Sequence, residues 1–357
     1  MGEEVTGARD VRAEDAFDVA AVDAWLRSTV DASRWGDGPP QVRQFSGGAS
    51  NLTYLLRYPN IDLILRRPPT GTKAKGAHDM GREYRIQEAL APVFGYVAPM
   101  VAHCRDESLL GSQFYVMERV AGPIPRTELG VDLPPAQVRQ LCTNVLDLLI
   151  DLHSVDPDAA GLASLGKGEG YVARQLDGWT ARFRKAKTWN VPSWEKVISW
   201  LTEDQPADRG AVLIHNDFRF DNVVLDPDEP TRPLALLDWE MATIGDPLMD
   251  LGNSLAYWVE AGDGRLERSF QVQPTHLPGM LTRAQVWEYY AERTGLTLTE
   301  RERAFYEVYG IFRLAVILQQ IYYRYHHKQT SNPRFKNFWL GSHMLHRRAR
   351  RLMRSAR

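Results

Sequence analysis

Two short apolar runs with a polar octet between them constrain this chain more than any other feature. The runs cover residues 211–214 and 223–225, and the octet, 215–222, reads His-Asn-Asp-Phe-Arg-Phe-Asp-Asn. A third apolar run, 234–237, ends in Asp238. Short apolar runs bounded by polar residues are typical of buried strands. The sequence therefore predicts strand, loop, strand, turn and strand, with the polar loop tied down at both ends.

The octet supplies oxygen-bearing side chains that can position a hydroxyl group and a hard cation. Asp217 can accept a hydrogen bond from a substrate alcohol. Asn222 offers a neutral oxygen and Asp238 a charged one, and Mg²⁺ binds such oxygens together with phosphate and water. A single Asp or Asn in a loop is most often a turn or cap residue. Asp217, Asn222 and Asp238 together, at this spacing around predicted strands, indicate a functional site far more specifically.

Composition is that of an ordinary globular protein. Of the 357 residues, 44% are hydrophobic and 25% charged, which argues against disorder, collagen-like repeats and coiled coil. The 43 basic and 45 acidic side chains nearly cancel, so we expect no nucleic-acid partner. Residues 347–357 carry six arginines and no acid. We interpret them as a solvated helix end, with an anionic contact as the alternative.

Cysteine usage and hydropathy bear on the compartment. The two cysteines, Cys104 and Cys142, are too few for a disulfide framework or a thiolate zinc site, and they fit a reducing compartment. The N-terminus lacks the apolar core of a signal peptide, and no stretch reaches the ~20 apolar residues of a membrane span. We therefore expect a cytoplasmic protein without a membrane partner.

The predicted elements divide the chain into an α+β arrangement of two lobes. Strands are expected at 41–46, 52–58, 61–67, 100–104 and 113–120, with one helix at 79–90. Later helices are expected at 134–152, 246–260, 282–293, 299–325 and 334–353. We predict a loose leader and a helix within 1–40, a small antiparallel sheet lobe over 41–120, and a larger, mainly helical lobe over 121–357. Such a layout favours a ligand cleft between the lobes.

The octet, together with Leu-Leu-Asp-Trp-Glu at 236–240, resembles the catalytic and metal-binding loops of the aminoglycoside phosphotransferase-like kinases. This family includes choline kinase-type enzymes and is related to protein kinases. The likeness runs from about residue 41 to residue 255, and its wording is closest to the kinase domains of the acyl-CoA dehydrogenase 10/11 group. It implies a protein-kinase-like bilobal fold and the use of ATP and Mg²⁺.

The resemblance also implies roles for the octet and its neighbours. Asp217 would be the catalytic base or hydroxyl-orienting residue, and Arg219 would neutralise charge on the transferred phosphoryl group. Asn222 and Asp238 would bind Mg²⁺. We interpret three further residues as structural: His215 supports the loop, Asp246 caps a helix that begins at Pro247, and Asp250 hydrogen-bonds the loop.

The nucleotide site implied by the resemblance lies in the first lobe. Its expected contacts are Gly47, Gly48, Ser50, Asn51, Arg66, Glu83, Glu118 and Val120. The adjacent glycines depart from the protein-kinase G-x-G-x-x-G, but a glycine hairpin can still direct backbone N–H groups at phosphate. Arg66 stands where kinases carry the phosphate-pairing lysine, with Arg67 as the open alternative, and Glu83 would pair with that arginine. The backbone at Glu118 and Val120 would hydrogen-bond adenine.

The acceptor is expected to be a hydroxyl group of a small molecule. Seven residues separate Asp238 from Asp246, which leaves no room for the long loop that docks a peptide in protein kinases. Residues 174–200 hold six basic residues, two acids and four tryptophans, unlike a site for polycationic aminoglycosides. A hydroxylated acyl or aromatic acceptor, such as a hydroxyacyl group on coenzyme A, fits this balance.

Three other functions remain open on the sequence. The first is an aminoglycoside-type antibiotic phosphotransferase, and the second is a non-catalytic nucleotide-binding scaffold with the same fold. The third is a metal-dependent hydrolase that uses His215, Asp217 and Asp238. This hydrolase would leave the glycine hairpin, Arg66 and Glu83 without a role.

Overall fold

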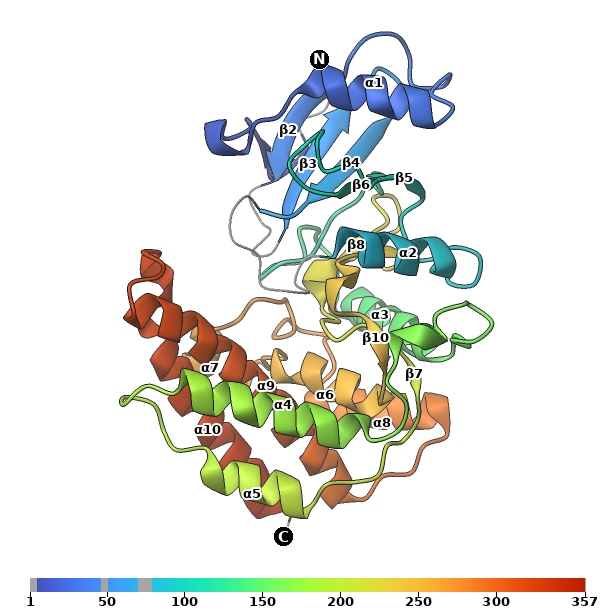
Figure 1. Ribbon diagram of the computed structural model, residues 1–357. Coiled ribbons are helices and arrows are strands. Elements are labelled where there is room, and N and C mark those ends of the chain that lie inside the picture. Colours follow the sequence, from blue (N-terminus) through green and yellow to red (C-terminus); the bar gives the residue numbers. More distant parts are fainter. Residues whose placement is uncertain (1–4, 46–50, 70–78, 357) are drawn as a thin grey trace. The chain divides into compact units, whose positions relative to one another are not determined.

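The computed structural model describes residues 5–45, 51–69 and 79–356 (Figure 1). These residues form two compact units. The first contains the described residues up to Ala121 together with Ala235–Glu240. The second contains Gly122–Leu234 and the described residues from Met241 onward. The N-terminal segment thus joins the sheet unit, and a short segment from 235 to 240 does so as well.

The first unit is built on a six-stranded antiparallel sheet in the order β1-β2-β3-β4-β6-β5. Its strands are β1 (Ala8–Arg9), β2 (Gln41–Phe45), β3 (Leu52–Arg57), β4 (Asp62–Arg67), β5 (Met100–Cys104) and β6 (Phe114–Glu118). Two helices accompany it, α1 (Val19–Thr29) and α2 (Met80–Leu90). The predicted antiparallel sheet and both helices are confirmed, with boundaries shifted by one or two residues.

Both faces of this sheet are buried because each is covered by a helix (Figure 1). Successive side chains of a strand point to opposite faces. Leu63 and Leu65 therefore pack with Val22 of α1, whereas Ile64 packs with Met80 of α2. This arrangement fixes the direction in which each side chain of β4 points.

The expectation of a loose leader over residues 1–16 is wrong for the part that the structure describes. β1 pairs with β2, and Asp15 is only 5% exposed. The Asp15 carboxylate accepts a 2.8 Å hydrogen bond from Gln44 Nε2, and its carbonyl accepts one of 2.6 Å from Arg67 Nη2. Buried polar groups need partners, and this segment supplies them without any apolar periodicity that a sequence pattern could reveal.

The second unit is mainly helical. Its helices are α3 (Pro135–His153), α4 (Tyr171–Ala186), α5 (Glu195–Glu203), α6 (Pro247–Ala256), α7 (Arg265–Ser269), α8 (Arg283–Thr294), α9 (Glu300–His326) and α10 (Phe338–Ser355). Short strands also occur: β7 (Val212–Ile214) pairs with β10 (Thr243–Gly245), and β8 (Val223–Leu225) pairs with β9 (Pro233–Leu236), of which only Pro233 and Leu234 belong to this unit. The predicted helix over 334–353 instead begins with a 3₁₀ turn, Pro333–Asn337.

Helices α6 and α9 approach closely at two glycines. A Cβ on Gly310 would lie 2.0 Å from the carbonyl oxygen of Gly252, and a Cβ on Gly252 would lie 2.4 Å from that of Tyr306. Both obstacles are backbone atoms, so side-chain movement could not relieve the clash. We expect Gly310→Ala to destabilise the protein by about 2 kcal/mol or more.

Gly178 provides the control for this substitution, because it is also a helical glycine. A Cβ there would meet only the far end of the Arg182 side chain, at 3.4 Å. Gly178→Ala should therefore raise stability, by about 0.5–1 kcal/mol. Thermal unfolding of both variants tests the contrast, and equal melting temperatures would contradict the close helix packing.

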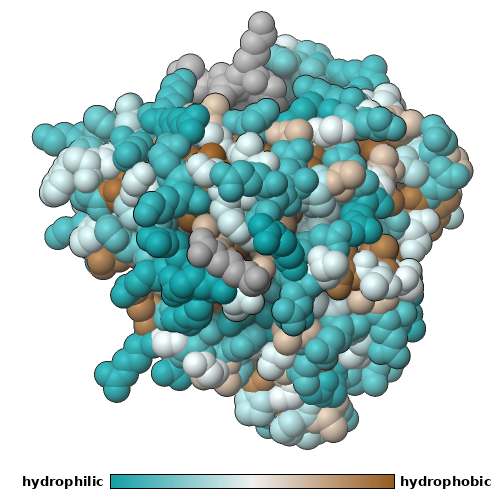
Figure 2. Space-filling model, turned by 90° about the horizontal axis from the view of Figure 1, so that it is seen from below, coloured by the Kyte–Doolittle hydropathy of each residue, from teal (hydrophilic) through white to brown (hydrophobic). Residues whose placement is uncertain are grey.

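The surface is largely hydrophilic. Figure 2, which views the molecule from the side of α5 and the C-terminal end, shows hydrophobic residues in small, separated patches. Large hydrophobic side chains that are exposed among the described residues are Val93, Trp189, Met241 and Val272. None of the helices in the described ranges combines the length and apolar character needed to cross a bilayer.

Candidate active site

Arg66 is the centre of a buried charge network in the first unit. Its guanidinium donates to Glu83 Oε1 at 2.6 Å and to Asp238 Oδ1 at 2.9 Å. Tyr115 donates its hydroxyl to the same Glu83 oxygen at 2.8 Å. Burial raises the pKa of Glu83, and the positive charge of Arg66 opposes that rise. The predicted pairing of Arg66 with Glu83 is confirmed.

Arg67 points to the opposite face of the sheet. It is 3% exposed and bonds the Tyr54 hydroxyl at 2.9 Å in addition to the Asp15 carbonyl. The Arg67 guanidinium is therefore occupied by internal contacts with β3 and with the N-terminal segment that precedes α1. Of the two arginines, Arg66 is the one that shares a network with Asp238.

Asp238 occupies an uncommon backbone conformation, with φ at 69°. A non-glycine residue in this left-handed region costs energy and is found most often at functional sites. Near it in the sequence, Glu240 accepts a 3.2 Å hydrogen bond from Asn51 Nδ2. The predicted phosphate contacts Gly47, Gly48 and Ser50 lie outside the described residues.

The predicted adenine linker is only partly available for hydrogen bonding. The Glu118 amide already donates to the Pro99 carbonyl at 2.8 Å, and the Glu118 side chain pairs with Arg34. Within the described ranges the Val120 amide has no hydrogen-bond acceptor. If this linker meets adenine, Val120 is the residue whose amide can donate.

The polar octet of the second unit runs from β7 through a 3₁₀ turn, Phe220–Asn222, into β8. This turn brings Asn222 back to Asp217. Asn222 Nδ2 donates to the Asp217 carbonyl at 2.8 Å and to its carboxylate at 3.3 Å. Since the amide nitrogen is used in this way, the amide oxygen of Asn222 is the atom left for a cation.

Asn216, which precedes Asp217, has φ at 64° and is held on every side. Its amide donates to Asp250 Oδ1 at 2.7 Å, and its carbonyl accepts a 2.9 Å hydrogen bond from Arg313 Nη2. Its side chain bonds Tyr171 and Asn253 at 3.2 Å each. Together these contacts hold Asn216 in a strained backbone conformation. Because Asn216 precedes Asp217, they also set the direction in which the chain enters Asp217.

Asp250 accepts hydrogen bonds from the loop, as the sequence predicted. It is fully buried, and its Oδ2 accepts 2.7 Å and 3.2 Å hydrogen bonds from the His215 amide and from His153 Nε2. Burial alone would raise the pKa of Asp250, but hydrogen bonds from His153 and the His215 amide hold it below its usual value. Because a carboxylate only accepts, His153 Nε2 donates this hydrogen bond, and Nδ1 lies 2.8 Å from the Tyr290 hydroxyl.

Arg219 sits among opposite charges beside Asp217. It forms ion pairs of 3.5 Å with Asp217 and 3.1 Å with Asp221, and its guanidinium lies 4.8 Å from the ring centre of Tyr257. Burial raises the pKa of Asp221, and the charge of Arg219 opposes that rise. Arg219 is thus placed next to the expected catalytic carboxylate, Asp217.

Several residues that contact the loop 215–222 were not predicted from the sequence, and four of them show why. They are His153, Tyr171, Tyr257 and Arg313, which come from α3, α4, the end of α6 and α9. Each lies in a helix or at its end with no local motif, so only the tertiary structure reveals its contact with the loop.

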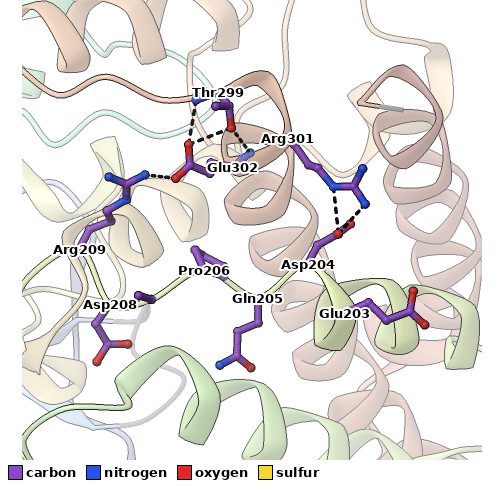
Figure 3. A pocket seen from close by; sticks show the side chains of 10 residues that line it. Glu203, Asp204, Gln205, Pro206, Asp208, Arg209, Thr299, Arg301 and Glu302 are labelled. Carbon is purple, nitrogen blue, oxygen red and sulfur yellow. Dashed lines mark hydrogen bonds and ion pairs between the residues drawn. The ribbon is translucent and has the colours of Figure 1, made fainter.

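A cavity of about 520 Å³ opens elsewhere in the second unit, between residues 203–209 and the start of α9 (Figure 3). Its arginines are already paired, Arg209 with Glu302 and Arg301 with Asp204. None of the predicted site residues lines this cavity. It is therefore separate from the candidate active site.

Each unit supplies one oxygen-bearing side chain of the kind that binds Mg²⁺ together with phosphate. Within the described ranges, no three His, Cys, Asp or Glu side chains cluster as an all-protein metal site. Mg²⁺ does not require such a cage, since one or two protein oxygens plus phosphate and water suffice. The Asn222 amide oxygen and the Asp238 carboxylate are ligands of that kind.

Comparisons with known proteins agree with these features. Residues 41–287 match the model of the phosphotransferase enzyme family. Acyl-CoA dehydrogenase family member 10 of Mus musculus is 35% identical over 321 residues, which are 90% of this chain and 30% of that protein. Family member 11 of Homo sapiens is 31% identical over 321 residues, 88% of this chain and 40% of that protein. The chain thus spans less than half the length of these relatives.

Solved structures share the fold. A Ralstonia eutropha protein, described as a "putative aminoglycoside phosphotransferase", has a TM-score of 0.78 and 29% identity, and the match covers 96% of this chain and all of that one. Choline kinase from Cryptosporidium parvum has a TM-score of 0.64 at 11% identity, with 95% and 96% of the two chains covered.

These likenesses confirm the predicted kinase-like α+β fold. The family model covers well over half of the sequence and includes the Arg66, Asp217 and Asp238 segments. The chain belongs to the phosphotransferase enzyme family.

Proposed function

We propose that this protein is an ATP- and Mg²⁺-dependent enzyme that moves the γ-phosphate to a hydroxyl group of a small molecule. Family membership and the kinase-fold neighbours support a small-molecule phosphotransferase. The observation that carries the proposal is the pairing of Asp217 with Asn222 on a loop that Asp250 anchors. An aminoglycoside phosphotransferase with this fold was solved with AMP-PNP, which supports ATP as the donor.

The side chains of the octet suit phosphoryl transfer, which depends mainly on positioning and electrostatic stabilisation. Asp217 would accept the proton of the acceptor hydroxyl and orient its oxygen. Arg219, next to Asp217, would stabilise negative charge that develops on the transferred group. Bound Mg²⁺, held by Asn222 and Asp238, would neutralise charge on the nucleotide phosphates.

Arg66 would bind phosphate in the first unit. Glu83 and Asp238 now hold its guanidinium, and this positions the fork that arginine offers to phosphate oxygens.

For the acceptor, we propose a hydroxyacyl compound, carried on coenzyme A or free, or another apolar or anionic hydroxyl compound. The basic, tryptophan-rich segment 174–200 supports this choice, as do relatives named as acyl-CoA dehydrogenases. An aminoglycoside acceptor is the second candidate, because the Ralstonia protein bears that description.

An acceptor screen tests the proposed function. Mg·ATP consumption is measured with hydroxyacyl-CoAs, free hydroxy acids, aminoglycosides, choline and sugars. We expect consumption that requires both Mg²⁺ and a hydroxyacyl compound. Consumption only with aminoglycosides would move the protein to the second candidate, and Mg·ATP binding with no acceptor-dependent turnover would make it a nucleotide-binding scaffold.

The two adjacent arginines provide a matched pair of variants. We expect Arg66→Lys to weaken Mg·AMP-PNP binding about tenfold, because lysine keeps the charge but loses the bidentate fork. Arg67→Lys should leave nucleotide affinity unchanged and lower the melting temperature, because Arg67 bonds Tyr54 and Asp15 internally. Calorimetric titration measures both affinities, and the reverse pattern would assign the phosphate contact to Arg67.

A further inference from the structure

Two arginines of the second unit share one indole ring beside the catalytic loop. The guanidinium of Arg182 lies 4.6 Å from the ring centre of Trp179, and that of Arg313 lies 5.2 Å from it. Arg182 and Trp179 belong to α4, and Arg313 belongs to α9, which runs beside α4 (Figure 1). The ring attracts each guanidinium, but the two positive charges repel each other, and an anion close to them would offset that repulsion.

Within the part of the chain that the structure describes, neither Arg182 nor Arg313 forms an ion pair with a carboxylate. Arg313 is only 4% exposed, and the one polar contact that the structure gives its guanidinium is with the Asn216 carbonyl. A buried arginine without an acid is costly, whereas most buried charges are paired.

Both charges also act on one hydroxyl group. Burial raises the pKa of Tyr309, and the positive charges of Arg313 and Arg182 oppose that rise. Arg182 itself is exposed, so a ligand can reach it from solvent, whereas Arg313 is buried. The Arg313 contact with Asn216 places this positive cluster one residue from Asp217, the expected hydroxyl-orienting group.

We propose that Arg182, Arg313 and Trp179 form an anion-binding subsite for the acceptor, one that takes a carboxylate or phosphate group of the hydroxyl compound. The inference rests on the proposed function and narrows its substrate class to anionic acceptors. Exposed Arg182 would bind the acidic group directly, while Trp179, which is 8% exposed, supports both guanidiniums and buried Arg313 adds positive charge to the subsite. A polycationic acceptor would be repelled by the same residues.

Calorimetric titrations test the subsite directly. Saturating Mg·AMP-PNP is added first to occupy the nucleotide site. If Mg·AMP-PNP itself does not bind, the proposed function fails, whatever the result for the subsite. Octanoate then serves as the carboxylate probe, with octanamide as its neutral counterpart, and coenzyme A serves as the phosphate probe, with pantetheine as its counterpart. We expect at least one anion to bind about tenfold more tightly than its neutral counterpart.

Two variants on α4 distinguish binding at the subsite from a general effect of removing one positive charge. Arg182→Gln should weaken binding of the anionic probe about tenfold. Arg184→Gln removes the same charge two residues away, where Arg184 pairs with Glu195, and should leave probe binding unchanged. Arg313→Lys should also weaken binding, and its AMP-PNP affinity shows whether the fold is intact.

Two results would overturn the subsite: neutral and anionic probes that bind equally to the wild-type protein, or an Arg182→Gln variant that binds the anion as tightly as Arg184→Gln does.

Discussion

Replacing Asp217 with asparagine should lower phosphoryl transfer by about 10²–10⁴-fold and leave nucleotide affinity nearly unchanged. Asparagine has almost the same shape but cannot accept the acceptor's proton. The Asn222 side chain also donates to the main-chain carbonyl of Asp217. This hydrogen bond does not involve the Asp217 side chain and would persist in the variant. Turnover is measured with the acceptor that the screen identifies, and AMP-PNP binding is measured by calorimetry.

Asp221 provides the matched control for Asp217. It lies in the same loop and pairs with Arg219, as Asp217 does. Asp221→Asn should reduce turnover far less, because Asp221 pairs with Arg219 and Arg126 and is not the group expected to accept the proton. Turnover of Asp217→Asn within about tenfold of wild type would remove Asp217 from its assigned role, whatever the effect of Asp221→Asn.

The sequence predicted most elements of the sheet unit but could not choose between Arg66 and Arg67. In a strand with one solvated face, apolar and polar residues alternate, and this pattern shows which side chains point inward. Here α1 covers one face and α2 the other, so apolar residues occur on both and the pattern carries no direction. The choice depends on which helix brings a carboxylate to the sheet, and α2 does so with Glu83.

The catalytic loop shows a similar division. Their spacing between predicted strands and at a helix start was enough to single out Asp217, Asn222 and Asp250, and the predicted hydrogen bonds between the loop and Asp250 are confirmed. The left-handed conformation of Asn216 could not be predicted, since it is maintained by Arg313, 97 residues further along the chain. Contacts over such separations leave no periodic or motif signal.

Loss of the Asp250 carboxylate should have the largest effect on stability. Asp250→Asn would remove a buried negative charge and turn an N–H group toward one of three donors: the amides of His215 and Asn216, or His153 Nε2. Leaving buried donors unpaired in this way costs about 3–5 kcal/mol. We expect a large drop in melting temperature, whereas Asp228→Asn at an exposed turn should change it little.

The pH dependence of that difference provides an independent check. The pKa of Asp250 is lowered in the folded protein, so the unfolded chain takes up this proton at a higher pH than the folded one does. The stabilisation is therefore fully present above the unfolded value of about 3.9 and is lost as the pH falls through the lower folded value. Melting temperatures of wild type and Asp250→Asn should differ by a constant amount from pH 6 to 8 and converge in acid. A difference that persists unchanged well below pH ~3.9 would show that the shape of the Asp250 side chain, and not its negative charge, holds the loop.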